Sequence, residues 1–291
     1  MLTLTFLGVG SAFAKRNFQS NALIEAWSAG PDKQRQPDDT LLIDFGATGP
    51  LTLHRLRGEP GFSYLDRGGA IRYSAIRRVF ITHLHGDHIA GLEELASVSR
   101  FAGGDGKPFR PQLISSQEIL SNLWDQSLRG GLGTLPGRPA AMEDYFSPCA
   151  LYASGQGDPD RVTMLDRYEV SMAPTDHIRV QRKHDWPSFG VVLRDVSSGD
   201  TAFYSGDTRF DPAGLGELMT RARINFHEVQ LADQPDPVHT LLSELRTLPA
   251  TIRKKTILYH YDDNWDDPAF RFVADEFAGF ATPHRRYELF A

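Results

Sequence analysis

Three histidines and an aspartate lie within residues 83–88 of this 291-residue chain. His83, His85, Asp87 and His88 follow directly after residues 79–81, an apolar run typical of a buried strand. Because residues two apart on a strand face the same way, we expect His83 and His85 to lie side by side. Imidazole and carboxylate groups are the ligands that zinc and similar divalent metals prefer. The stretch therefore predicts a metal site rather than a polar strand end.

The segment after this motif has the spacing of an amphipathic helix. Leu92, Leu95 and Val98 recur at intervals of three residues, and the polar residues between them face away. The motif is thus predicted at a strand–loop–helix junction, where rigid elements hold the ligands. Similar patterns predict a helix that begins within residues 51–56 and a helix-like run over residues 240–248.

Predicted strands elsewhere in the chain also lead to residues that can bind a metal. His177, Asp207, Glu228 and His260 each end or follow one of them, so we expect all four at one rim of the sheets. Asp44, at another strand end, either supports metal ligands from behind or caps a turn. The predicted strands are residues 2–7, 21–27, 41–46, 168–173, 189–193, 201–204, 224–228 and 256–260.

Composition and charge favour an ordinary globular protein without a long polyanionic ligand. Hydrophobic residues make up 41% and charged residues 23% of the chain, and the formal net charge is −6. The single cysteine, Cys149, excludes a disulfide framework and a cysteine-rich zinc site, and we expect an inert thiol. No apolar run approaches the ~20 residues of a membrane span, and the alternating N-terminal residues predict a strand rather than a signal peptide. We therefore expect a cytoplasmic protein without a membrane partner.

Residues 1–291 are predicted to form a single domain with an elaboration at about residues 101–166. Glycine clusters at residues 103–106 and 129–133 frame an amphipathic segment, residues 117–128. Neither cluster is followed by the Lys-Ser/Thr pair that opens the helix of a P-loop. We expect this region to be an insertion that forms a lid beside the site or a dimer surface.

The order of these motifs resembles that of the metallo-β-lactamase superfamily over nearly the whole chain. The resemblance implies an α/β (α+β) fold, a four-layer αββα sandwich of two mixed sheets flanked by helices. It also implies a two-metal site at the edge that both sheets share. The matching residues are 6–11, 42–46, 83–88, His177, 205–208 and Tyr259-His260.

The same resemblance implies two Zn²⁺ ions per chain, with Mn²⁺ or another divalent metal as a possible replacement. Asp207 would bridge the ions, which lie about 3.5–4 Å apart in such sites. Water bound to the metals has a pKa near ~7, so hydroxide is available at neutral pH. The remaining ligands would be His83, His85 and His177 for one ion, and Asp87, His88 and His260 for the other.

Residues 226–229 and 239–240 resemble motifs of the tRNase Z-like phosphodiesterases within this superfamily. This resemblance implies that His239 is the general acid that protonates the leaving oxygen, with Glu228 as its orienting partner. A histidine suits this role because an unperturbed imidazole titrates near neutral pH. Hydroxide between the metals would attack phosphorus. Asp87 and the bridging aspartate would hold this hydroxide in place. The alternative is a helix-start histidine with a solvated glutamate.

Several features favour a small nucleotide phosphodiester over tRNA as the substrate. The segment after His88 reads Ile-Ala-Gly-Leu-Glu-Glu rather than the Gly-Leu-Pro type of tRNA-processing enzymes, and no long basic, glycine-rich arm is present. Tyr259-His260 is a mild departure from the usual Thr-His. The short-loop pattern is similar to that of cyclic-nucleotide phosphodiesterases of this branch, which include phage and bacterial anti-Pycsar enzymes. We therefore predict a cyclic mononucleotide as the substrate.

Residues near the ligands in sequence are candidates to contact the substrate. His184 could contact a phosphate, Trp186 could stack on a base, and Asn17 could line the pocket. An exposed histidine and a core tryptophan are equally consistent with the sequence. Because this branch tends to dimerise, we also expect a homodimer.

Other functions share parts of this pattern. A tRNA 3′-processing endonuclease would have the same fold and metals. A lactonase or other carbonyl hydrolase would leave Glu228 and His239 without an evident role. A non-enzymatic, metal-stabilised binding protein would not need all seven ligands.

Overall fold

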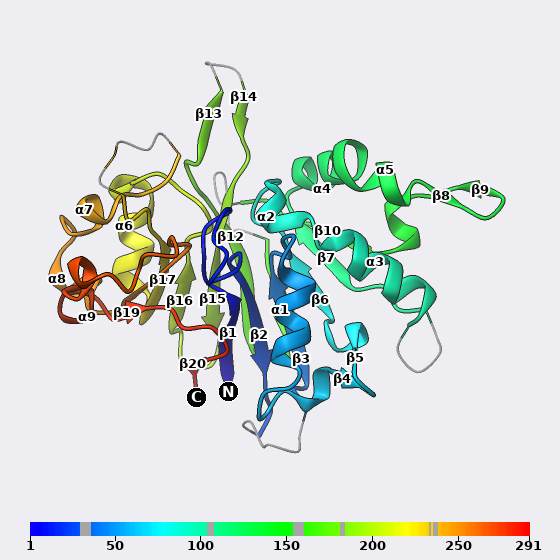
Figure 1. The fold of residues 1–291 in the computed structure, drawn as a ribbon, viewed down its shortest axis with the longest axis horizontal. Helices are drawn as coiled ribbons and strands as arrows, with labels where there is room; N and C mark the ends of the chain where they lie inside the picture. Colours follow the sequence, from blue (N-terminus) through cyan, green and yellow to red (C-terminus); the bar gives the residue numbers. More distant parts are fainter. Residues whose placement is uncertain (30–35, 104–107, 154–159, 181–183, 233, 235–237) are drawn as a thin grey trace.

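Two mixed β-sheets lie face to face in the computed structural model of this chain (Figure 1). The structure describes residues 1–291 except residues 30–35, 104–107, 154–159, 181–183, 233 and 235–237. Within those residues each sheet has seven strands, in the orders β10-β7-β6-β3-β2-β1-β20 and β11-β12-β15-β16-β17-β18-β19. The first sheet consists of β1 (Leu2–Gly8), β2 (Asn21–Ala26), β3 (Asp39–Ile43), β6 (Arg78–Phe80), β7 (Gln112–Ser115), β10 (Ser147–Ala150) and β20 (Arg286–Phe290). The second consists of β11 (Val162–Met164), β12 (Tyr168–Pro174), β15 (Phe189–Asp195), β16 (Thr201–Tyr204), β17 (Ile224–Glu228), β18 (Thr256–Tyr259) and β19 (Gly279–Phe280).

The central strands of the first sheet are buried on both faces. Successive side chains of a strand point to opposite faces, and neighbours in β2 enter different cores. Ile24 joins the core between the two sheets, where it lies in one cluster with Val191 and Leu193 of the second sheet. Leu23 joins a second core with Leu53, beneath the helices on the outer face. This double burial explains why these strands read as continuous apolar runs in the sequence.

Helices cover the outer faces of both sheets, which completes four layers (Figure 1). On the first sheet they include α1, α3 and α4, and on the second α6, α7 and α8. The described helices are α1 (Gly49–Leu56), α2 (Gly86–Ile89), α3 (Leu92–Phe101), α4 (Gln117–Leu123), α5 (Arg129–Leu132), α6 (Pro212–Arg221), α7 (Leu242–Leu245), α8 (Ala250–Arg253) and α9 (Val273–Glu276). A π-helical turn at Trp124–Leu128 joins α4 to α5, and single 3-10 turns span Ser63–Leu65, Tyr73–Ala75, Met142–Asp144 and Pro268–Phe270. The predicted αββα fold is confirmed. Among the described residues, none of the helices has the length and apolar character needed to cross a membrane.

Three short hairpins complete the described structure. They pair β4 (Asp66–Arg67) with β5 (Ala70–Ile71), β8 (Thr134–Leu135) with β9 (Arg138–Pro139), and β13 (Ile178–Val180) with β14 (His184–Trp186). The β13–β14 hairpin stands out beyond the ends of the sheets (Figure 1). Residues 101–166 contribute β7 and β10 to the first sheet, in addition to α4, α5 and the β8–β9 hairpin.

Two predicted boundaries are wrong. The helix predicted over residues 240–248 is reduced to the single turn α7, because the backbone is still extended at Leu241. Leu242 N donates a hydrogen bond to Gln230 O at 3.0 Å, and Gln230 N donates one to Thr240 O at 2.8 Å. These backbone groups therefore do not form the hydrogen bonds of a helix. The strand predicted over residues 41–46 ends at Ile43, because Asp44 has a left-handed φ of 59°.

The parallel strands of both sheets end at one shared edge. In the first sheet β3, β6, β7 and β10 are parallel, and in the second β16, β17, β18 and β19 are parallel. Ligand sites of open sheets commonly lie beyond the carboxyl ends of such strands. The polar residues that follow β6, β16, β17 and β18 are therefore brought to a single place.

Candidate metal centre

The first donor set consists of three histidines from both halves of the chain. His83 and His85 follow β6, and His177 follows β12. His85 Nδ1 lies 3.0 Å from His83 Nε2 and 3.2 Å from His177 Nε2. The carboxylate of Asp207 approaches the same point, with Oδ2 at 3.8 Å from His83 Nε2. Three ring nitrogens thus face one another in the way that ligands surround an ion.

The second donor set lies beside the first. Asp87 and His88 belong to the short helix α2, and His260 follows β18. Asp207 Oδ2 lies 3.3 Å from His88 Nε2 and 3.3 Å from His260 Nε2. Asp87 Oδ2 lies 3.2 and 3.4 Å from the same two nitrogens. In each set the candidate donor atoms lie within 4.8 Å of one another, and Asp207 belongs to both sets.

Buried donor atoms without hydrogen bonds fit a divalent metal. His88 and Asp207 are each 1% exposed. In the part of the chain that the structure describes, Asp207 Oδ1 forms no hydrogen bond, and His88 Nε2 forms none either, although two carboxylate oxygens lie 3.2 and 3.3 Å from it. A buried polar atom without a partner calls for an explanation, and a bound ion is one. The two His/Asp sets therefore fit a divalent metal site.

Protonation states in the first set also suit metal binding. Burial lowers the pKa of His83, His85 and His177, so these imidazoles are neutral near pH 7. A neutral imidazole is the form that coordinates a metal. Burial also acts to lower the pKa of His88, but three neighbouring carboxylates outweigh it and raise that pKa. For Asp207, burial acts to raise the pKa, but the nearby imidazoles outweigh it and keep the carboxylate ionised.

Asp44 holds His88 from behind. Asp44 Oδ2 accepts hydrogen bonds from His88 Nδ1 and Thr82 Oγ1, both at 2.7 Å, and Oδ1 accepts one from Thr82 N at 2.8 Å. This leaves His88 Nε2 directed at the donor set. The structure thus decides between the two roles considered for Asp44, in favour of supporting a candidate ligand. His177 is held in a similar way, since its Nδ1 lies 2.7 Å from the carbonyl oxygen of Val238.

Glu228 and His239 lie together at one side of the donor sets. His239 Nδ1 is 3.4 Å from Glu228 Oε1, and the His239 ring centre lies 5.0 Å from that of His260. Glu228 is fully buried, and its Oε1 accepts hydrogen bonds from the backbone N–H groups of Thr208 and Thr240 at 3.1 and 3.0 Å. The alternative of a solvated glutamate is therefore wrong. The carboxylate of Glu228 thus lies on the Nδ1 side of the His239 ring.

The three residues predicted to contact a substrate differ in their placement. Trp186 is 37% exposed, and its ring lies over His85 with the ring centres 5.9 Å apart and the planes 26° from parallel. Asn17 is buried, and its amide nitrogen lies 3.4 Å from the carbonyl oxygen of Asp262 in the neighbouring loop. The side chain of His184 lies outside the described residues, although its backbone begins β14. Only Trp186 of the three is thus seen against a donor histidine in the described structure.

The structure also reveals contacts that the sequence motifs do not contain. Thr82 hydrogen-bonds to Asp44, and the backbone groups of Thr208, Val238 and Thr240 hold the side chains of Glu228 and His177. The three backbone contacts depend on the path of the main chain, which no residue type signals. Thr82 lies inside the motif region, so its proximity to His83 was the one available signal.

This arrangement, two facing mixed sheets with histidines and aspartates at their shared edge, defines a metallo-β-lactamase fold. The metallo-β-lactamase fold protein YhfI from Bacillus subtilis shares it, with a TM-score of 0.65, 16% identity and 98% of each chain covered. Unliganded yeast PDE1 matches with a TM-score of 0.69, 15% identity and 99% of each chain covered. The short form of human tRNase Z matches with a TM-score of 0.64 and 18% identity, over 99% of this chain and 100% of the other. These likenesses concern the fold.

Sequence comparison identifies the particular family. The family described as Anti-Pycsar protein Apyc1 matches residues 2–287. Anti-Pycsar protein Apyc1 of Paenibacillus sp. (strain J14) is 34% identical over 267 residues, which cover 91% of each chain. That of Bacillus phage vB_BsuM-Goe3 is 32% identical over 268 residues, covering 91% of this chain and 90% of the relative. The chain belongs to the Anti-Pycsar Apyc1 family and is a metal-dependent hydrolase, as the resemblance of its motifs predicted.

Proposed function

We propose that this protein is a phosphodiesterase that hydrolyses a small cyclic mononucleotide at a centre of two divalent ions. The observation that carries the proposal is the position of Asp207 in both donor sets, next to the buried Glu228–His239 pair. Two ions held by a shared carboxylate suit an in-line displacement at phosphorus. Membership of a family whose members are described as anti-Pycsar proteins supports the cyclic-nucleotide substrate that the motifs imply.

The donor sets suggest how the ions would be held. His83, His85 and His177 would bind one Zn²⁺, and Asp87, His88 and His260 the other, with Asp207 between them. When bound, such ions lower the pKa of water and neutralise charge on the phosphate oxygens. The acceptor oxygens of Asp87 and Asp207 can accept hydrogen bonds from the attacking water and so fix its orientation. Zinc suits this set because five of its seven donors are imidazoles, although Mn²⁺ remains compatible.

His239 would supply the proton for the leaving group. Glu228 Oε1, held by two backbone N–H groups, favours the tautomer of His239 with a proton on Nδ1. In the protonated ring Nε2 also carries a proton, which it can donate to the departing ribose oxygen. A positioned general acid is needed here because an alkoxide is a poor leaving group.

Trp186 offers a surface for the base of the substrate. Its ring lies over His85, on the exposed side of the first donor set, and 37% of the residue remains exposed. An aromatic face of this kind stabilises a stacked base by about 1–3 kcal/mol. We also assign His184 and Asn17 to the substrate-binding region, His184 because it lies on the same strand as Trp186.

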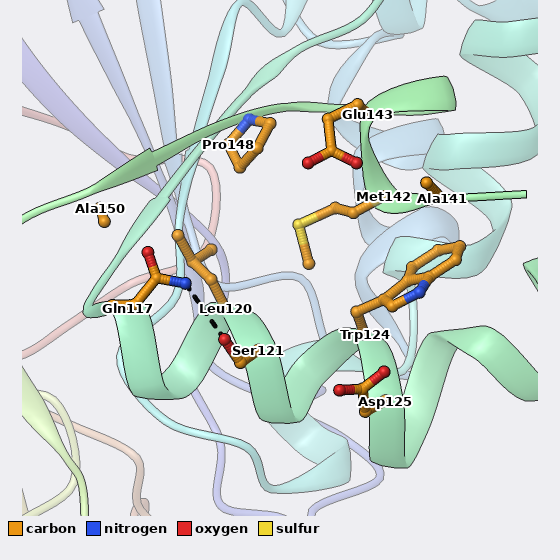
Figure 2. Close-up of a pocket in the computed structure, with 10 residues that line it drawn as sticks. All are labelled: Gln117, Leu120, Ser121, Trp124, Asp125, Ala141, Met142, Glu143, Pro148 and Ala150. Carbon is orange, nitrogen blue, oxygen red and sulfur yellow. Dashed lines mark hydrogen bonds between the residues drawn. The ribbon is translucent and has the colours of Figure 1, made fainter.

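We further propose that residues 101–166 form an insertion within the single domain that serves as a homodimer surface or a lid. A hollow of about 530 Å³ lies in this region. The Met142 side chain and the Trp124 ring are among the residues that line it (Figure 2). None of the candidate metal ligands lines it. Light scattering on the purified protein measures the mass directly. For the wild type we expect a mass twice that of one chain. For Trp124→Glu we expect the mass of one chain.

The proposed function is tested with a panel of phosphodiesters. The purified, zinc-loaded protein is incubated with 3′,5′-cyclic mononucleotides of all four bases, with precursor tRNA and with lactones. We expect rapid conversion of at least one cyclic mononucleotide to the nucleoside monophosphate. Precursor tRNA and the lactones should be cleaved little. Cleavage of precursor tRNA or lactones with no action on any cyclic mononucleotide would contradict the proposal.

A further inference from the structure

The loop that carries Asp207 depends on a backbone turn with little freedom. Gly206 has a left-handed φ of 62°, and a Cβ atom at this position would lie 2.6 Å from the carbonyl oxygen of Phe189. The turn therefore requires glycine. Glycine by itself is the most permissive residue, so other groups must fix the turn if the carboxylate of Asp207 is to stay between the donor sets.

Two buried hydroxyl groups converge on the carbonyl oxygen of Gly206. Ser205 Oγ donates to this oxygen at 2.6 Å and Tyr259 OH donates to it at 3.1 Å. The two hydroxyl groups lie 3.3 Å apart, and Ser205 Oγ accepts a hydrogen bond from Glu228 N at 3.1 Å. Gly206 O belongs to the peptide group that leads into Asp207. Fixing this oxygen therefore fixes the plane from which the Asp207 backbone departs.

These contacts join the ends of three neighbouring strands. Ser205 follows β16, Glu228 ends β17 and Tyr259 ends β18, where Glu228 and Tyr259 are direct neighbours in the ladder. Tyr259 also immediately precedes His260, a member of the second donor set. The side chain of Tyr259 thus links the peptide group before Asp207 to the backbone of His260, whose ring faces the Asp207 carboxylate.

We propose that Tyr259 is a positioning residue for the metal centre, acting with Ser205 through the Gly206 carbonyl to hold the carboxylate of Asp207. The inference rests on the proposed metal centre and not on any particular substrate. Tyr259 also occupies the position at which the resembling motifs have a threonine. The longer side chain reaches across to the β16 loop from β18, which accounts for a tyrosine at this site.

The chain offers a matched control in Tyr204. Its ring stacks on Tyr259 with the ring centres 4.6 Å apart, and both residues are buried. The Tyr204 hydroxyl lies beside that of Tyr259, but only Ser205 and Tyr259 donate to the Gly206 carbonyl among the described side chains. Removing the Tyr204 hydroxyl therefore changes the same aromatic cluster and leaves both donors to that carbonyl in place.

The test measures zinc binding by metal-stripped, full-length protein in competition with a chromophoric chelator. Tyr259→Phe should weaken binding of the more weakly held ion roughly 10- to 100-fold, as loss of an outer partner typically does. Tyr204→Phe should bind zinc as the wild type does. Thermal unfolding of the metal-free proteins separates this effect from a general loss of stability. Because no substrate is present, a wild type that binds zinc but hydrolyses nothing would refute the proposed function without affecting this test.

Two results would overturn the assignment. One is wild-type zinc affinity in Tyr259→Phe, and the other is an equal loss in Tyr259→Phe and Tyr204→Phe. If Tyr259→Phe does not fold, Ser205→Ala decides, because it removes the second donor to the same carbonyl. Weaker zinc binding in Ser205→Ala supports the role, and unchanged binding refutes it.

Discussion

Replacing His239 by alanine removes the group that we propose as the donor of a proton to the leaving oxygen. The ring centre of His239 lies 5.0 Å from that of His260 and 5.2 Å from that of His177, so the ring lies close to one histidine of each donor set. A positioned general acid contributes about 10²- to 10⁴-fold to a rate. For the poor leaving group of a cyclic nucleotide, the full factor should be lost. That loss corresponds to about 2.7–5.4 kcal/mol of transition-state stabilisation.

The assay compares two substrates with the same zinc-loaded protein. Hydrolysis of a cyclic nucleotide by His239→Ala should fall by about 10²- to 10⁴-fold. Hydrolysis of bis(p-nitrophenyl) phosphate should fall far less, because nitrophenolate departs without a proton. Zinc content, measured by elemental analysis, should equal that of the wild type. An equal fall on both substrates, or loss of zinc, would refute the role of His239 as general acid.

Three further predictions follow from individual contacts. Asp44→Asn should weaken zinc binding roughly 10- to 100-fold in a chelator competition, because His88 loses the carboxylate that orients it; unchanged affinity would contradict this. The hydrogen bond from Arg167 lowers the pKa of Asp195, so the pair stabilises the fold above pH ~4 and is lost as the pH falls. Urea unfolding of Arg167→Gln should therefore show a deficit of roughly 1 kcal/mol at pH 7 that narrows towards pH 3, and a deficit independent of pH would argue against the pair. Chelation of the metal should abolish hydrolysis and lower the unfolding temperature in a thermal melt, because an ion bound to the folded state stabilises it; full activity in excess chelator would exclude a metal centre.

The candidate ligands could be predicted because their signals are local and ordered. His83 and His85 follow an apolar strand at a spacing of two, and His177, Asp207 and His260 each follow a later strand. Strand ends are recognisable from the sequence, and parallel strands bring their carboxyl ends to one edge. Most individual strands could be predicted because they are apolar runs bounded by turn residues, whereas the four-layer αββα arrangement is predicted from the resemblance of the motifs to the metallo-β-lactamase superfamily.

The remaining parts of the site depend on main-chain geometry that the sequence does not display. The extended backbone at Leu241 cannot be read from residues 240–248, whose apolar spacing also fits a helix. The direction of Asn17 towards Asp262 depends on how two loops meet. The role of Tyr259 depends on the carbonyl of Gly206, a group that every residue carries. Side-chain types thus predict which residues gather, and the backbone decides how they are held.

The most direct test of the central claim is the hydrolysis of 3′,5′-cyclic mononucleotides by zinc-loaded wild-type protein and by Asp207→Ala, followed by chromatography of the product. Asp207 is the one residue common to both sets of candidate metal ligands. The account predicts that the wild type releases nucleoside monophosphate and that Asp207→Ala, which should lose zinc, does not. Equal hydrolysis by both proteins, or none by a wild type that retains two zinc ions, would contradict it.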